Sequence, residues 1–369
     1  MAEDLEIARL ITLNRIPSIG GQTIRNLISA FGNTEEIFKA KNNHFTSVDG
    51  IGKKLANSLY AHLQLDVGMR ELEFIHKKNI QAYSWYDNDF PHRLKNCADS
   101  PVLLFAKGKI NWNAQRIVSI VGTRKSTPYG LDCTEQLIAE MADKGNYIVV
   151  SGLAYGIDGI AHRACLKHQV PTWGVLAHGL DQIYPTKHRE LAKDMLYQQG
   201  ALITEFTTGT AMVPNNFLSR NRIVAGLSSC TVVVESAAKG GSLVTADIAN
   251  SYNHDVFAFP GRNTDKYSAG CNQLIKSNQA HLMHRLSDLE YIMDWQQKNK
   301  AKPEAQRQLF IELSAEEEAL CKHLSKEPIF IDVLCHSAQI PISKALSLLF
   351  SLEFKGVVRS HVGKMYSLI

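Results

Sequence analysis

The stretch RIVSIVGTRKSTPYGLDCTEQLIAEMADKGNYIVVSG, residues 116–152, decides the fold. Two short apolar runs, at 117–121 and 147–151, enclose a longer segment with the spacing of an amphipathic helix that ends near Lys144. Strands of a parallel sheet are buried on both faces and therefore read as continuous apolar runs. The stretch thus predicts a strand, a helix and a second, parallel strand.

The same alternation continues toward the C-terminus. Further apolar runs are TWGVLAHG at 172–179, ALITEF at 201–206, TVVVE at 231–235 and DVFAFPG at 255–261, with helical patterns that begin near His188 and Ser242. Strands and helices in this order predict an α/β fold, a Rossmann-like and mostly parallel sheet with helices on both faces. We expect this core to cover residues 66–295, in which residues 66–115 connect to the sheet and extend it.

The first 65 residues have a different pattern. Helical periodicity is broken by two glycine-containing turns, at 16–21 and 48–54, which predicts a helical domain of the helix-hairpin-helix (SAM-like) type over residues 1–65. A glycine turn followed by a helix N-terminus offers backbone N–H groups to a phosphate. The first turn lacks a lysine and is interpreted as a connector, whereas Gly50 to Lys54 fits either a connector or a phosphate contact.

The C-terminal part begins after a polar stretch. Residues 296–312 contain three lysines and a proline and few apolar residues, which is typical of a linker. Residues 313–369 then give three helical patterns and two short strands around a glycine turn, the order of a winged helix. From residue 314 onward six Lys and Arg balance six Asp and Glu. Because duplex-reading modules are basic, we expect this domain to contact protein.

Composition limits the function classes. The chain has 45% hydrophobic and 21% charged residues, and 40 Lys and Arg against 36 Asp and Glu, so a basic surface must be local. Seven dispersed cysteines form no C-x-x-C pair, which indicates reduced thiols of a cytoplasmic protein and no zinc site. The start lacks a signal-peptide pattern and no apolar run reaches membrane-spanning length, so we expect no membrane contact.

Candidate binding residues follow the predicted strands. In open parallel sheets, ligands bind beyond the carboxyl ends of the strands. Those positions are rich in glycine, where backbone N–H groups approach anions closely, and in basic residues. The residues that we assign to this phosphate-binding rim are Gly122, Thr123, Arg124, Ser151, Gly152, Lys187, Arg220, Asn221, Arg222, Gly240, Gly241 and Ser242.

The rim lacks the fingerprints of catalysis. The rim has none of four motifs that mark nucleotide, serine-nucleophile or metal sites: G-x-G-x-x-G with a downstream acid, G-x-x-x-x-G-K-[ST], G-x-S-x-G and H-E-x-x-H. We therefore expect neither a nucleotide cofactor, nor a metal, nor catalysis. Asp158 and His162, four residues apart on one predicted helix, fit an acid/base pair. They also fit a hydrogen-bonded pair that fixes the loop at Gly156, which is the interpretation that we favour.

These stretches resemble the DNA-processing protein A family, also called Smf. The resemblance rests on IVGTRKSTPYG, VVSGLAYGIDGIAHRACL, the Tyr-Pro at 184–185, FLSRNRIVAGLSSCTVVVESAAKGGSLVTADIA, and FAFPG followed by SAGCNQLIKSNQA. It implies a dimeric protein that binds single-stranded DNA, protects it and helps to load the RecA recombinase during natural transformation. It also implies that Arg124, Lys187 and the cluster at 220–222 contact DNA.

The chain departs from the family pattern at two places, and two other functions compete with the resemblance. The family has S-G-S where this chain has Gly240-Gly241-Ser242, and G-T-N where it has Gly270-Cys271-Asn272, which puts the polar contact of the second loop in doubt. A nucleoside-monophosphate-cleaving enzyme is the main alternative, but its P-G-G-x-G-T-x-x-E signature is incomplete between residues 235 and 247. A transcriptional regulator that acts through the winged helix is the other.

Overall fold

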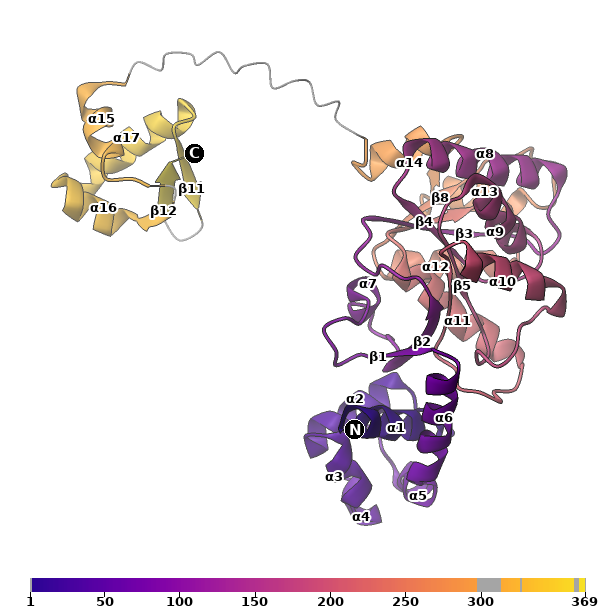
Figure 1. Cartoon of the computed structure of the whole chain (residues 1–369). Helices are drawn as coiled ribbons and strands as arrows, with labels where there is room; N and C mark the ends of the chain where they lie inside the picture. Colours follow the sequence, from indigo (N-terminus) through magenta and orange to yellow (C-terminus); the bar gives the residue numbers. More distant parts are fainter. Residues whose placement is uncertain (1, 297–312, 326, 362–364, 369) are drawn as a thin grey trace. The chain divides into compact units, whose positions relative to one another are not determined.

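The computed structural model describes residues 2–296, 313–325, 327–361 and 365–368. The chain forms two compact units, Met1–Gln296 and Gln297–Ile369 (Figure 1). Apart from Gln296, the predicted linker at 296–312 lies outside the described residues. The first unit holds the helical head and the α/β core, and the second holds the winged helix.

The head consists of six helices around one apolar core. They are α1 (Ala2–Arg15), α2 (Gly21–Phe31), α3 (Thr34–Lys39), α4 (Asn42–Phe45), α5 (Lys53–His62) and α6 (Leu65–Lys77). Leu72 and Ile75 of α6 share this core with residues of α1 such as Leu10 and Ile11. The same core includes Leu103 and Phe105, so the packing of the head continues beyond α6.

The core is built on a nine-stranded sheet in the order β1-β2-β6-β5-β4-β3-β7-β8-β9. The strands are β1 (Gln81–Ser84), β2 (Leu103–Gly108), β3 (Arg116–Val121), β4 (Tyr147–Ser151), β5 (Thr172–Val175), β6 (Ala201–Thr204), β7 (Cys230–Val233), β8 (Asp255–Ala258) and β9 (His281–Leu282). From β6 to β9 neighbouring strands are parallel, whereas β1 and β2 are antiparallel at the other edge. Within residues 66–115, β1 and β2 extend the sheet as predicted, whereas residues 66–77 belong to α6 of the head.

Helices cover both faces of the sheet (Figure 1). One face packs on α7 (His92–Lys95), α11 (Pro214–Leu227), α12 (Gly241–Ser251) and α13 (Ala269–Lys276). The other packs on α8 (Pro128–Lys144), α9 (Ile157–His168) and α14 (Leu286–Ile292), and α10 (Arg189–Tyr197) has a smaller apolar cluster of its own. Side chains alternate between the faces, since Ile117 joins one cluster and Val118 the other.

The second unit has its own apolar core. It contains α15 (Ala315–Cys321), β10 (Ile329–Phe330), α16 (Ile331–Ala338), α17 (Ile342–Phe354), β11 (Val358–His361) and β12 (Met365–Leu368). The three predicted helices and two predicted strands are present, and β10 adds a third strand to the sheet. Among the described residues no single helix is long and apolar enough to cross a membrane; α16 and α17 pass that test only as a pair bent by 106°.

Candidate nucleic-acid interface

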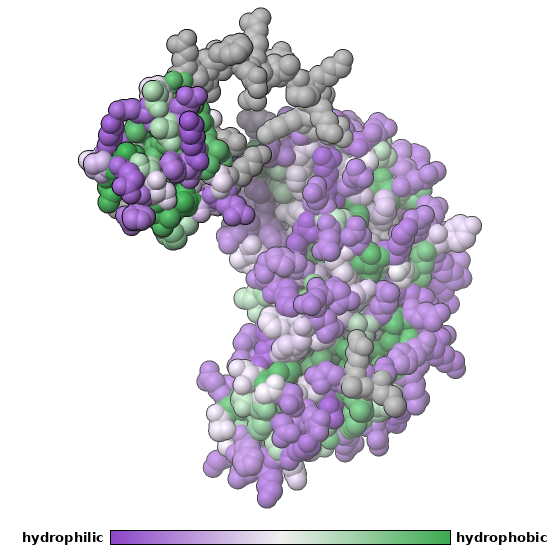
Figure 2. Space-filling model, turned by 60° about the vertical axis from the view of Figure 1, so that its left-hand side comes forward, coloured by the Kyte–Doolittle hydropathy of each residue, from purple (hydrophilic) through white to green (hydrophobic). Residues whose placement is uncertain are grey.

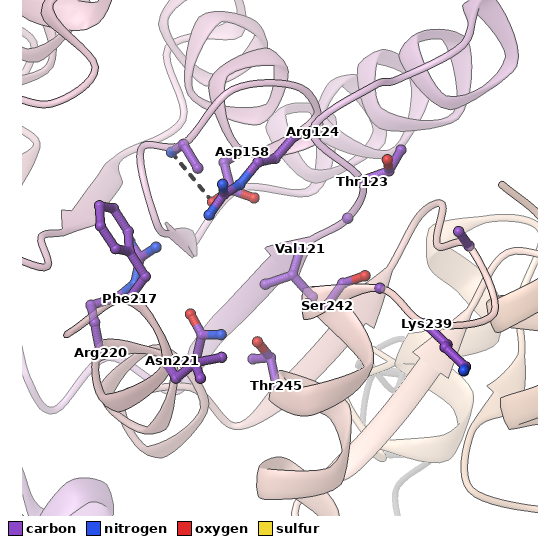
Figure 3. A pocket seen from close by; sticks show the side chains of 16 residues that line it. Val121, Thr123, Arg124, Asp158, Phe217, Arg220, Asn221, Lys239, Ser242 and Thr245 are labelled. Atoms are coloured by element: carbon purple, nitrogen blue, oxygen red, sulfur yellow. Dashed lines mark hydrogen bonds between the residues drawn. The ribbon is translucent and has the colours of Figure 1, made fainter. Parts of the chain in front are cut away.

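A cavity of about 430 Å³ lies at the carboxyl edge of the sheet, where β3 and β7 are neighbours (Figure 3). The chain proceeds from β3 through β4, β5 and β6 on one side and returns to β7 on the other. This is the topological switch point at which open α/β sheets hold their ligands. Loops after β3, β4 and β7 and the first turns of α11 and α12 line the cavity.

The loop after β3 is held by a buried carboxylate. Glu235, 2% exposed, accepts hydrogen bonds from the Thr127 backbone N–H at 2.9 Å and the Thr127 hydroxyl at 2.6 Å. Its own carbonyl oxygen accepts a bond from the Thr123 N–H at 2.7 Å. These bonds fix the loop on both sides of Arg124, which is itself exposed. The fixed loop presents that guanidinium at the mouth of the cavity.

The loop after β4 is held by Asp158. The Oδ2 atom of Asp158 accepts hydrogen bonds from the Gly152 N–H at 3.1 Å and the Ala154 N–H at 3.4 Å. His162 instead contacts the Thr172 hydroxyl at 2.7 Å through Nδ1. The prediction of a bonded Asp158–His162 pair was therefore wrong, because each side chain has a different partner; Asp158 fixes the loop without the histidine.

Arg220 is a buried part of the cavity wall. It is 4% exposed and donates from Nη1 to the carbonyl oxygens of Gly152 and Val175. A Cβ atom at position 152 would lie 2.2 Å from this guanidinium, so any other residue there would force Arg220 out of its present position. Burial lowers the pKa of Arg220 to about 10, which leaves the group charged at neutral pH, and the charge of Asp158 opposes this shift.

The first turn of α12 forms the opposite wall. Gly240 is the N-cap and offers no side chain, and the space beside Gly241 is open. The Ser242 hydroxyl donates to the Ser236 hydroxyl at 2.9 Å. Open N–H groups at a helix N-terminus attract anions. Figure 3 shows the Arg124 side chain beside Asp158, on the side of the cavity where Phe217 lies, and Ser242 of this turn on the other side.

An aromatic cluster adjoins the cavity. The Arg124 guanidinium carbon lies 5.8 Å from the ring centre of Phe217, and that ring lies 5.7 Å from the ring of Tyr184. A second, smaller pocket is lined by Arg124, Phe217, Tyr155 and Tyr184, among others. Bases of single-stranded nucleic acid stack on such rings. No aromatic residue was assigned to the site from the sequence, because Tyr155, Tyr184 and Phe217 were seen only as the nearest rings and charge was expected to dominate over stacking.

The structure brings most of the predicted rim residues together. Those that line the large cavity are Gly122, Thr123, Arg124, Arg220, Asn221, Gly240, Gly241 and Ser242. Gly152 lines the small pocket. Further lining residues that were not predicted from the sequence include Asp158, Phe217, Lys239 and Thr245.

Three predicted residues line neither pocket. Ser151 is buried, and its hydroxyl donates to the Ile120 carbonyl at 2.7 Å. Lys187 is exposed in the short 3-10 turn Thr186–His188, two residues after Pro185 of the small pocket. Arg222 forms an ion pair with the buried Glu205 and donates to the Asp99 carbonyl, so its guanidinium has intramolecular partners.

The loop with the unusual cysteine keeps its polar contacts. Asn272 donates to the Gly261 carbonyl at 3.0 Å and accepts from the Gly261 N–H at 3.1 Å. Cys271 is buried, and its thiol contacts the Val233 carbonyl at 3.7 Å. Within the described residues, no three His, Cys, Asp or Glu side chains are grouped to hold a metal ion.

Fold and site together define a Rossmann-like protein with a basic, glycine-lined cavity at its switch point, preceded in the sequence by a helical head and followed by a winged helix. A family model described as DNA recombination-mediator protein A matches residues 81–294. The chain belongs to this family. Models of a SAM-like helix-hairpin-helix tandem and of the DprA winged helix domain match residues 10–66 and 300–364. The predicted fold class and family resemblance are thus confirmed.

Individual relatives agree with this assignment. The chain is 32% identical to Protein Smf of Synechocystis over 73% of its own length and 68% of that protein. It is 38% identical to the DNA processing protein DprA of Bacillus subtilis, over 56% and 69% of the respective chains. The solved DprA structure from Streptococcus pneumoniae matches with a TM-score of 0.65 and 28% identity, covering 78% of this chain and 97% of that one.

A second solved structure bears on DNA binding. It is that of DNA processing protein A from Helicobacter pylori, and it is described as giving insights into a unique single-stranded DNA binding mode of that protein. It matches with a TM-score of 0.52 and 28% identity, over 58% of this chain and 96% of that one.

Proposed function

We propose that this chain binds single-stranded DNA along the carboxyl rim of its sheet and performs no catalysis. The observation that carries the proposal is the position of Arg124, which is exposed, lies over the Phe217 ring, and has no carboxylate within ion-pair distance in the described ranges. A free cation binds phosphate and an adjacent ring stacks on a base. The Helicobacter pylori relative, which is described as binding single-stranded DNA, supports the same ligand.

The absence of catalysis is proposed because the acidic and imidazole groups near the cavity are engaged. Asp158 binds two backbone N–H groups, Glu235 binds Thr127, and His162 is buried against Thr172. A general acid or base must be able to reach substrate. The alternative, cleavage of nucleoside monophosphates, would be favoured by release of ribose 5-phosphate from AMP.

The cellular role follows from the family. We place the chain in the cytoplasm, where it protects incoming single strands and helps to load the RecA recombinase during natural transformation. Strand-exchange assays with DNA coated by a single-strand-binding protein test the loading step, which should need both this chain and RecA.

A homodimer through the core is part of the proposal. Leu274, Leu286 and Leu289 of the last two helices of the core are buried in the chain's own interior and are therefore not available to a partner. The edge strand β9 supports a dimer better, because Leu282 is 47% exposed and Tyr291 of the following helix is 72% exposed. Sedimentation of the Leu282→Arg variant should show weaker self-association than the parent if this edge forms the dimer.

The central experiment is a gel-shift comparison. Single-stranded oligothymidine should bind at concentrations at which duplex of equal length remains free, because duplex bases cannot reach the Phe217 and Tyr184 rings. Equal affinity for both would contradict the proposal.

A further inference from the structure

The outer face of α17 in the winged helix is apolar. Ile342, Leu346, Phe350 and Phe354 are 50%, 43%, 74% and 90% exposed. They are spaced by four residues and therefore form one continuous ridge, here called the α17 ridge. Hydrophobic surface is visible on the C-terminal unit in Figure 2.

The α17 ridge is not required for the core of its own unit. Ala345, Leu349 and Leu352, on the inner side of α17, are each 0% exposed and pack with α15 and α16. Large aromatic side chains in water are costly, and contiguous apolar patches of this kind mark interaction surfaces.

The charges on this face disfavour nucleic acid as the partner. Within α17 the charged residues are Lys344 and Glu353. Lys344 lies 2.6 Å from Glu316, and Glu353 accepts a hydrogen bond from the Ser360 N–H at 3.2 Å. A helix that reads DNA presents free basic or amide groups to phosphates and base edges. The exposed face of α17 instead offers hydrocarbon and two serine hydroxyls, at 343 and 347.

We propose that the α17 ridge pairs with the same ridge of a second copy of this chain. Ser343 and Ser347 form a row of small, exposed residues directly beside the ridge, so the ridge of one helix fits the groove of the other, as in common helix packing. The exposed parts of the four side chains amount to roughly 500 Å² per copy, so two copies bury at most about 1,000 Å², which is the lower limit for a specific interface and fits a weak, reversible contact. Like charges do not oppose this contact, because the unit has equal numbers of acidic and basic residues from 314 onward.

This contact is independent of the proposed DNA site and of the β9 edge. It uses neither the cavity residues nor Leu282, and its loss should leave affinity for single-stranded DNA per chain unchanged. Failure of the DNA-binding proposal would therefore leave this pairing untouched, and the reverse also holds.

The direct test places a photo-cross-linking amino acid at position 347 of the full chain. Nitrogen-15-labelled and unlabelled chains are mixed, and cross-linked peptides are identified by mass spectrometry. Mixed-isotope pairs that join α17 to α17 are the expected result. Cross-links only within one chain would show that another segment of the same chain covers the ridge, and mixed pairs to a different segment would exclude the α17–α17 contact; either outcome overturns the proposal.

Sedimentation measures the strength of the contact. In the full chain that also carries Leu282→Arg, which weakens the proposed β9 contact, Leu346→Glu with Phe350→Glu should raise the dissociation constant of self-association at least tenfold relative to Leu282→Arg alone, and Phe350→Ser should raise it less. Tyr197→Glu is the matched control, since Tyr197 is also 90% exposed but belongs to α10 of the other unit. Circular dichroism confirms that each variant is folded. Self-association equal to that of the parent in both ridge variants would overturn the proposal.

Discussion

Arg220 Nη1 donates a hydrogen bond of 2.5 Å to the carbonyl oxygen of Val175, 45 residues earlier in the chain. The same atom donates to the Gly152 carbonyl, so one guanidinium joins α11 to the ends of β4 and β5. Because Arg220 is buried, we expect it to shape the rim more than to meet DNA directly.

Replacement of Arg220 should therefore reduce stability as well as DNA affinity. Arg220→Met leaves the buried carbonyls of Gly152 and Val175 without this donor, and the loss of such partners costs about 1–3 kcal/mol. Arg220→Lys keeps the charge but loses the planar fork, so its loss should be smaller. Urea denaturation checks both values, and an Arg220→Met protein as stable as the parent would refute this role.

Phe217→Ala separates stacking from charge. Removal of a stacked ring weakens single-strand binding by about 1–3 kcal/mol per base, without changing the number of phosphates contacted. The affinity should fall while its salt dependence stays the same. Tyr197→Ala is the control, since Tyr197 is an exposed aromatic residue of α10 that lines neither pocket. Equal effects of the two variants would argue against stacking at Phe217.

Glu71 of the head holds a loop of the core. Its carboxylate accepts from the Thr208 N–H at 2.8 Å and from the Thr208 hydroxyl at 2.5 Å, and lies 3.6 Å from Arg15. Glu71→Ala leaves this loop's polar groups without partners, which should lower the free energy of unfolding by roughly 1–3 kcal/mol. Glu73→Ala, at an exposed position of the same helix, should have little effect in the same urea titration. If the free energy of unfolding changed equally little in Glu71→Ala and Glu73→Ala, the contact between Glu71 and Thr208 would not stabilise the protein.

His162 should make the folded protein sensitive to acid. Burial lowers its pKa from 6.5 to about 3, with the charge of His188 as the next cause. Below about pH 6.5 the unfolded chain binds a proton that the folded chain does not, so stability falls as the pH falls. Between pH 8 and pH 5 this histidine should remove about 2 kcal/mol. His162→Gln should lessen the pH dependence by that amount, whereas His336→Gln, at an exposed position, should not.

The core strands could be predicted from the sequence because parallel strands are buried on both faces, and their apolar runs contain only a few small polar residues such as Ser119 and Thr231. Helix α11 was not predicted, since its polar residues at 215, 216, 219, 221 and 222 obscure the apolar face at Ile223 and Leu227. Its one clear signal was Pro214 at the first helical position.

Because residues 220–222 belong to helix α11, the two arginines of the predicted cluster have different environments. Successive helical residues are about 100° apart, so residues 220 and 222 point about 160° apart around α11. Arg220 consequently lies in the cavity wall, whereas Arg222 pairs with Glu205. Phe217, three residues before Arg220, shares the cavity face for the same reason. Their closeness in the sequence predicted that both arginines lie on the rim, but the geometry of the helix places only Arg220 in the cavity wall.

The most direct test of phosphate binding at the rim is the salt dependence of affinity for labelled oligothymidine, followed by fluorescence anisotropy. For single strands, log affinity falls with log salt with a slope of about −0.7 per phosphate neutralised. Arg124→Ala and Lys187→Ala should each flatten that slope by somewhat less than one unit, because each removes one exposed cation. An unchanged slope in both variants would contradict phosphate binding at this rim.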